Sequence, residues 1–316
     1  MTVFAATLTA LAPLFALILL GYALKRARVL HSAHAPVLNG LVVNATLPAL
    51  VVHGLATAPA IPARAFCAPL AIFLTELALF ALILTFGRIL RLSRPRLGAL
   101  LLVGTFGNTG FLGYPITLAL LPHQFPTAIL IDQFGMTVPL TIAAALIGSL
   151  YGSAQTQEGA SAALLRLLRS PILPALALGL LAHFLPAAHA FLASPLGQIL
   201  DKTLGYLAQG TTPLVLLAVG LALRPEAAGK NVLPLLLSCT LKLLISPLIM
   251  LPLSRLFGLR GDLLTISILL AAMPTSVMSS VYSAHHDMDG DYAVATVFVS
   301  TLLSALTIPW MLSLAR

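Results

Sequence analysis

Long apolar runs, separated by short polar stretches, cover almost the whole of the 316-residue chain. Each run has about 20 residues, the length that an α-helix needs to cross the hydrocarbon core of a membrane. The pattern predicts ten membrane-spanning helices, at residues 3–24, 36–57, 65–86, 97–121, 127–150, 171–187, 203–223, 231–253, 263–283 and 292–314. The break between the sixth and seventh rests only on Pro186 and Pro195, because residues 171–200 hold no charge.

Composition supports the same interpretation and excludes a soluble domain. Hydrophobic residues make up 59% of the chain and charged residues 8%, against about 25% charged residues in soluble proteins. The mean hydropathy is +1.03. The first run has no Lys or Arg before it and is too long for a cleaved signal peptide, so we expect it to remain as a span. The expected fold class is an all-α integral membrane protein without a sizeable extramembrane domain.

Basic residues fall unevenly between alternate loops. Of the 17 Lys and Arg, eleven follow odd-numbered spans, five lie on the opposite side, and Lys242 lies inside a span. Short loops rich in Lys and Arg stay on the cytoplasmic side of a membrane. The charge pattern therefore predicts both termini outside, and the net charge of +8 reports orientation rather than nucleic-acid binding.

Two halves of five spans each flank a polar linker at residues 151–170. Because five is odd, the second half (171–316) must enter the membrane from the side opposite to the first (1–150), which is the topology of inverted repeats. Landmarks recur at separations of 161 to 166 residues, in the pairs Pro13 and Pro174, Pro48 and Pro213, Glu76 and Lys242, and Asn108 and Pro274. Within the linker, a Leu-rich amphipathic stretch at 162–168 predicts a short interfacial helix.

The fourth and ninth predicted spans are each interrupted near the centre. The sequence GNTG at 107–110 is followed by Pro115, and MPTS stands at 273–276. Irregular backbone at membrane depth is tolerated only where protein or a watery cavity covers it. Paired interruptions in two repeats indicate a transporter binding site, although Gly and Pro can also merely kink membrane helices.

A half-helix that begins at the bilayer centre directs unsatisfied N–H groups and a partial positive charge at its surroundings, which suits a carboxylate. Glycines next to such a start let the backbone approach a ligand closely. We therefore expect substrate contacts from the residues that flank the two interruptions: Gly107, Asn108, Thr109, Gly110, Pro274, Thr275 and Ser276. In the alternative interpretation, these side chains only satisfy the interrupted backbone.

Charged side chains inside spans are rare, because each costs at least about 2.5 kcal/mol at the membrane centre. Glu76 and Lys242 occupy matching repeat positions and are predicted to pair behind the crossing. Protonation of Glu76 would loosen the pair and couple transport to protons, whereas in the alternative the pair is static. Asp132, next to Gln133 near the outer end of the fifth span, is a candidate for a substrate or proton role.

Two amides precede mid-span prolines by four residues, Asn44 in the second span and Gln209 in the seventh. They are predicted to line the pathway from the scaffold side. In the alternative, they bond to neighbouring helices, which is the commoner role of such amides.

Four segments resemble the auxin efflux carrier family, and the likeness extends over essentially the whole chain. They are FGNTGFLGYPI at 106–116, LVVNATLPAL at 41–50, and MPTSV at 273–277 with DYAVATVFVSTLLS at 291–304. The resemblance implies ten spans in two inverted repeats, a scaffold of spans 1, 2, 6 and 7, and a moving transport domain of spans 3–5 and 8–10. It also implies a homodimer. The short linker resembles compact prokaryotic members, which implies a bacterial inner (plasma) membrane.

These observations predict a secondary active transporter of a small organic anion, such as a mono- or dicarboxylate, with an elevator-like movement. The alternatives are a sodium-coupled symporter of the bile acid carrier type and a channel or receptor. No phosphate-binding GxxxxGK[ST] motif and no pair of catalytic groups at membrane depth is present, so we expect no enzyme and no cofactor. The HHDMDGD loop at 285–291 lacks the complete calcium pattern, so no metal site is predicted.

Overall fold

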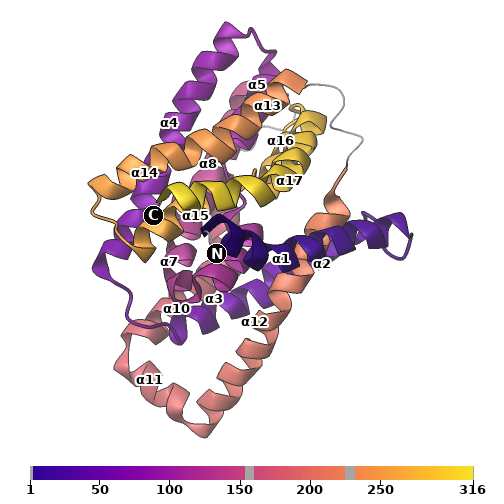
Figure 1. Cartoon of the computed structure of the whole chain (residues 1–316). Helices are drawn as coiled ribbons and strands as arrows, with labels where there is room; N and C mark the ends of the chain where they lie inside the picture. Colours follow the sequence, from indigo (N-terminus) through magenta and orange to yellow (C-terminus); the bar gives the residue numbers. More distant parts are fainter. Residues whose placement is uncertain (1–2, 154–159, 225–231, 316) are drawn as a thin grey trace.

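The computed structural model describes residues 3–153, 160–224 and 232–315, and these residues form helices and loops without a strand (Figure 1). The first half contains α1 (Val3–Arg26), α2 (His34–Leu41), α3 (Leu47–Ala56), α4 (Ala68–Ile89), α5 (Arg94–Thr105), α6 (Tyr114–Leu120), α7 (Phe125–Leu130) and α8 (Val138–Tyr151). The second half contains α9 (Ala160–Leu168), α10 (Ile172–Phe184), α11 (Pro186–Ala193), α12 (Pro195–Ala222), α13 (Val232–Thr240), α14 (Ser246–Leu256), α15 (Asp262–Ala271), α16 (Val277–His285) and α17 (Gly290–Ala315).

Seven continuous helical segments of the described residues are long and apolar enough to cross a membrane. Four contain one of these helices each, α1, α4, α12 and α17, and three join two helices, α2 with α3, α7 with α8 and α13 with α14. An eighth span results if α10 and α11, which meet at a bend of 92°, are counted as one. Two shorter apolar helices, Thr109–Leu120 and Asp262–Ala271, lie where the sequence predicts interrupted spans. The chain is therefore an all-helical, multi-pass membrane protein, and the count of ten spans stays a prediction.

Four segments of wider, π-helical backbone interrupt the helices: η1 (Val42–Thr46), η3 (Thr109–Gly113), η5 (Ile131–Thr137) and η8 (Leu241–Ile245). Each of them leads directly into a helix whose second residue is proline: Pro48, Pro115, Pro139 and Pro247. Proline lacks an N–H and its ring clashes with the carbonyl four residues earlier. Widening the preceding turn is one way for a helix to continue past that obstacle.

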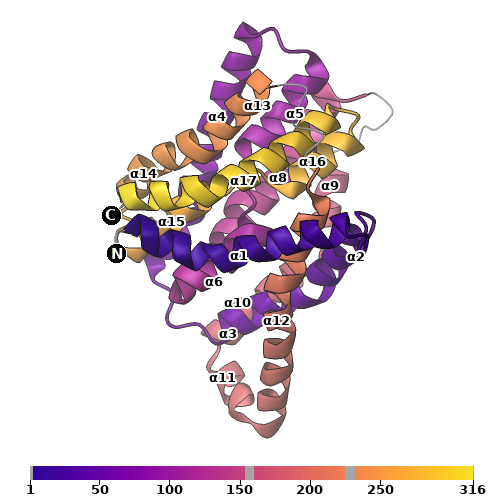
Figure 2. The ribbon, with the colours of Figure 1, turned by 45° about the vertical axis from the view of Figure 1, so that its right-hand side comes forward.

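The helices pack as two groups. The first group contains α1, α2, α3 and α10–α12, with α1 and α3 packed against α12 and α10 packed against α3. The second group contains α4–α8 and α13–α17, in which α5 contacts α4, α8, α16 and α17. In Figure 1, α11 and α12 lie at the bottom and α4, α5 and α13 at the top. Figure 2 shows the two ends of the chain next to each other, where α1 lies along α17.

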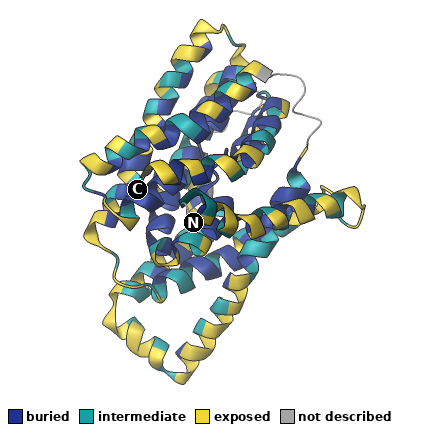
Figure 3. Cartoon of the chain, in the orientation of Figure 1, coloured by how far each residue is buried: buried dark blue, intermediate teal, exposed yellow. Residues whose placement is uncertain are grey.

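The helices that lead to the interruptions are buried along their apolar length, and Figure 3 colours the chain by burial. Every residue of α5 from Leu97 to Thr105 is buried, and so is every residue of α15 from Leu264 to Ala271. In contrast, α11 has no buried residue. A helix that is apolar and buried on all sides lies inside a protein, so α5 and α15 reach the interruptions through the interior of the second group.

Candidate binding site at the helix crossing

The two interruptions meet and pair with each other. Gly107 and Thr275 form an isolated antiparallel bridge. The Asn108 N–H donates to the Pro274 carbonyl at 2.7 Å, and the Ser276 N–H donates to the Phe106 carbonyl at 2.9 Å. Backbone N–H and C=O groups that have no helical partner at the interruptions are thus hydrogen-bonded across the crossing, as the interior of a membrane requires.

Side chains of the second interruption satisfy the end of α5. The Thr275 hydroxyl donates to the Val103 carbonyl at 2.8 Å, and the Ser279 hydroxyl donates to the Leu102 carbonyl at 3.1 Å. The last carbonyls of a helix have no intrahelical partner. Thr275 is therefore directed at α5 and is fully buried.

Lys242 hydrogen-bonds in the same way to a carbonyl at the end of α15. Its Nζ donates to the Ala271 carbonyl at 2.7 Å and to the Ser246 hydroxyl at 3.3 Å. A cation at a helix C-terminus interacts favourably with the helix dipole. A methyl group added at Gly107 would lie 2.9 Å from Lys242 Cε and 3.1 Å from its Nζ, so the lysine side chain lies directly against the crossing.

Glu76 is buried in α4 and makes no direct ion pair with Lys242 among the ion pairs of the described residues. Neither of its carboxyl oxygens has a described hydrogen-bond partner. The predicted partners thus share the interior of the second helix group, and the lysine bonds instead to the end of α15. An ionised carboxyl without a donor is costly at this depth.

Asp132 stands at the centre of a hydrogen-bond network beside the first interruption. Its Oδ1 accepts a hydrogen bond from the Thr109 hydroxyl. Its Oδ2 accepts from the Tyr114 hydroxyl and from Gln133 Nε2, each at 2.7 Å. Three donors suit an ionised carboxylate, which only accepts. The start of the half-helix at Thr109 therefore already has a carboxylate of the protein beside it.

A cavity of about 460 Å³ borders the crossing. Its wall includes predicted contact residues from the first interruption, namely Gly107, Asn108, Thr109 and Gly110, together with Ser276, Asp132 and Gln133. The Nδ2 atom of Asn108 is buried and has no described hydrogen-bond partner. Asn108 thus offers one unpaired donor at the cavity wall, of the kind that an anionic oxygen accepts from.

The remaining predicted residues lie elsewhere. Pro274, Thr275, Glu76 and Lys242 are not part of the cavity wall. Asn44 and Gln209 are exposed and also lie outside it, and the Asn44 amide donates to its own helix at the Gly40 carbonyl, at 2.8 Å.

The sequence did not predict several residues of the cavity wall, among them Met136, Arg169 and Tyr282. A sequence signal for part of the site does exist, because Thr109 and Asp132 lie a short distance before Pro115 and Pro139, and the backbone at both positions is π-helical. Such turns often mark functional positions.

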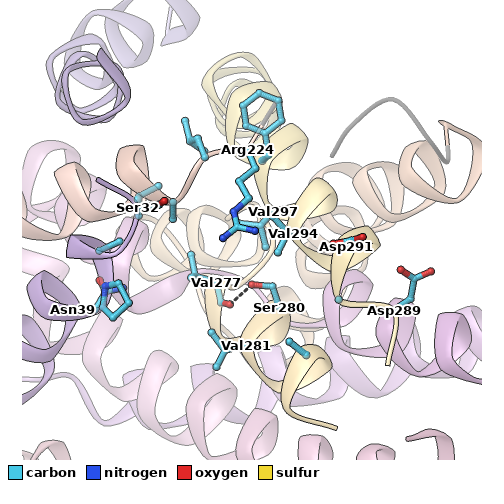
Figure 4. Close-up of a pocket in the computed structure, with 18 of the residues that line it drawn as sticks. Ser32, Asn39, Arg224, Val277, Ser280, Val281, Asp289, Asp291, Val294 and Val297 are labelled. Carbon is cyan, nitrogen blue, oxygen red and sulfur yellow. Dashed lines mark hydrogen bonds between the residues drawn. The ribbon is translucent and has the colours of Figure 1, made fainter. Parts of the chain in front are cut away.

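A second, larger cavity of about 850 Å³ lies on the other side of α16 (Figure 4). Val277, Ser280 and Val281 of α16 line it, whereas Ser276, Met278 and Tyr282 line the cavity at the crossing. Its rim carries Arg224 together with acids of the 285–291 loop. Among the described residues, no group of three or more His, Cys, Asp or Glu is arranged to hold a metal ion.

The fold and this site define a class: a multi-pass helical membrane protein whose interrupted helices cross beside a cavity. The family described as "Membrane transport protein" matches residues 6–312. The chain therefore belongs to this family, the auxin efflux carriers that its motifs resemble, and it is a transporter rather than an enzyme.

Curated relatives match almost end to end. An "Uncharacterized transporter" of Methanocaldococcus jannaschii is 27% identical over 92% of this chain and 93% of its own. Another of Methanothermobacter thermautotrophicus is 27% identical over 93% of each chain. A protein of Rhizobium meliloti named "Putative malonate transporter" is 29% identical over 96% of this chain and 94% of its own.

Proposed function

We propose that this protein is a secondary active transporter of a small organic anion, with the substrate bound in the cavity at the crossing. The observation that carries the proposal is the Asn108 amide, whose Nδ2 is buried at the cavity without a hydrogen-bond partner. A buried donor without an acceptor costs free energy. An anionic oxygen bound there would satisfy it, and the name of the Rhizobium meliloti relative supports a carboxylate.

Of the two half-helix starts, the one at α16 is the better place for a substrate carboxylate. Asp132 already lies beside the start at Thr109 and would repel a second anion there. At α16, Ser276 precedes the helix without a side-chain cap and lines the cavity. The bound anion would then lie between Asn108 and the N–H groups that follow Ser276.

The antiparallel pairing of the interruptions supports ten spans arranged as two inverted repeats, at 1–150 and 171–316 around the linker 151–170. In this scheme α5 with α6 forms span 4, and α15 with α16 forms span 9. The first helix group would be the scaffold and the second the transport domain. An elevator-like movement of the second group against the first would take place along the interface where α1 contacts α17 and α6.

The excess of basic residues after odd-numbered spans supports a bacterial inner-membrane orientation with both termini outside. With that orientation, α6 is the outer half of span 4 and packs against α1 of the scaffold. The inner half of span 9 is α16, which has a cavity on each flank. We infer that the structure represents a state open toward the cytoplasm.

Proton coupling through Glu76 belongs to the proposal. A neutral Glu76 is less costly than an ionised one where no donor is present. Sodium coupling of the bile acid carrier type is less well supported. The Lys242 ammonium already bonds to the Ala271 carbonyl, so this oxygen at the end of α15 has a cationic partner from the protein. The homodimer implied by the family resemblance remains a prediction.

Counterflow in proteoliposomes tests the proposal. The purified protein is reconstituted with unlabelled malonate inside, and the entry of labelled malonate, malate or indole-3-acetate is followed with and without a pH gradient. Saturable exchange of one acid is expected, with a KM raised about tenfold or more in Asn108→Ala, because a hydrogen bond to a charged group is lost. If no acid exchanges, the proposed substrate class is wrong; non-saturable flux would indicate a channel.

A further inference from the structure

Two ionic side chains of the described residues line the cavity at the crossing, Asp132 and Arg169. The carboxylate of Asp132 is engaged by three donors of the protein. Arg169 takes part in none of the ion pairs formed by the described residues, and its side chain is exposed. The wall of the cavity thus presents one cation that is open to a ligand.

The fold holds Arg169 at this wall from two sides. The residue lies at the end of the linker, between α9, which packs against α8, and α10, which packs against α3. Its backbone N–H donates to the Leu165 carbonyl at 3.1 Å. The three residues that follow, Ser170 to Ile172, line the cavity as well. The guanidinium is therefore carried by ordered backbone that forms part of the cavity itself.

The cavity on the other flank of α16 has the opposite electrostatic character. Figure 4 shows Arg224 extending toward Val294 and Val297, with Asp289 and Asp291 on the neighbouring helix end. A third acid, Asp287, also lines this cavity. The Asp289 carboxylate is paired with Arg96 at 2.8 Å. Because Asp289 is paired with Arg96, two further acids face one arginine at this wall, and this flank disfavours a small polyanion relative to the flank that carries Arg169.

We propose that Arg169 is a specificity-determining residue that binds a carboxylate of the substrate. This inference rests on the proposed function and adds a second anchor: one carboxylate lies at Asn108 and the start of α16, and another is held by Arg169. Guanidinium is suited to this task because its planar donors match a carboxylate with two parallel hydrogen bonds. A substrate with one carboxylate would occupy the first anchor only.

The test compares malonate with propionate, which has the same three-carbon chain but a single carboxylate. Initial rates of counterflow are measured for the wild type, Arg169→Gln, Arg169→Lys and the matched control Arg224→Gln, which loses the same charge on the other flank. We expect Arg169→Gln to raise the KM for malonate about 10-fold to 100-fold and to leave that for propionate unchanged. Arg169→Lys should be intermediate, and Arg224→Gln should resemble the wild type.

A second measurement does not depend on any variant. A dicarbonyl reagent that modifies guanidinium groups is applied to the wild type, and the modified arginines are quantified by mass spectrometry. Malonate should protect Arg169 several-fold, propionate should not, and Arg224 should be modified equally in all samples.

The outcomes separate this inference from the proposed function. Three results would overturn the role of Arg169 while the transporter assignment stands. They are normal malonate exchange in Arg169→Gln, an equal loss of exchange for malonate and propionate in that variant, and an equal effect of Arg224→Gln. Absence of protection by malonate in an exchanging wild type would do the same. A wild type that exchanges no carboxylate contradicts the proposed function and this inference together.

Discussion

Gly107 lies where the two interruptions touch Lys242, and replacing it by alanine should be costly. The added Cβ would meet Lys242 Cε at 2.9 Å and Nζ at 3.1 Å, both shorter than a normal van der Waals contact of about 3.5–4.0 Å. Movement of the lysine would break its 2.7 Å bond to the Ala271 carbonyl. If the lysine stays, the overpacking costs about 1–3 kcal/mol; if it moves, the lost charged hydrogen bond costs about 1.5–3 kcal/mol instead.

Gly110→Ala is the matched control, three residues away in the same motif. Its added Cβ would have Asp132 atoms at 3.5 Å as nearest neighbours, which is an ordinary contact. In detergent, thermal unfolding followed by circular dichroism should show a melting temperature several degrees lower for Gly107→Ala and nearly unchanged for Gly110→Ala. Equal melting temperatures for the two variants would refute the argument that Lys242 is held against Gly107.

Three further predictions concern charged side chains. Asp132→Asn should destabilise the protein by about 2–4 kcal/mol, because an amide cannot accept from all three donors. Tyr114→Phe removes only one donor and should cost about 1 kcal/mol. Equal losses of stability for the two variants in denaturant unfolding would contradict the network. Glu76→Gln should change the free energy of unfolding by less than about 1 kcal/mol, since no hydrogen bond of the carboxyl is lost. The same variant should abolish the effect of a pH gradient on counterflow. Full pH dependence in this variant would reject the coupling role. Asp289→Asn removes the partly exposed ion pair with Arg96. The free energy of unfolding should fall by less than about 1 kcal/mol, and the effect should be smaller at high salt. A salt-independent loss of several kcal/mol would show that the pair is not a surface pair.

The sequence by itself determined the membrane class, the family and the positions of the two interruptions. Apolar runs of spanning length have no other stable environment, and Gly and Pro interrupt helices through local sterics. It also singled out Gly107, Asn108, Thr109, Gly110 and Ser276, which line the cavity at the crossing, and their contact with a substrate stays a prediction. Local chemistry was sufficient for all of these predictions.

Only the tertiary structure decided which partner each buried polar group takes. Thr275 bonds to Val103, 172 residues earlier in the chain, and Lys242 bonds to Ala271 rather than to Glu76. Arg169 reaches the cavity because α9 and α10 pack on helices of different groups. A buried donor takes the nearest acceptor that secondary structure has left free, and helices far apart in the sequence must be packed together before that acceptor is defined.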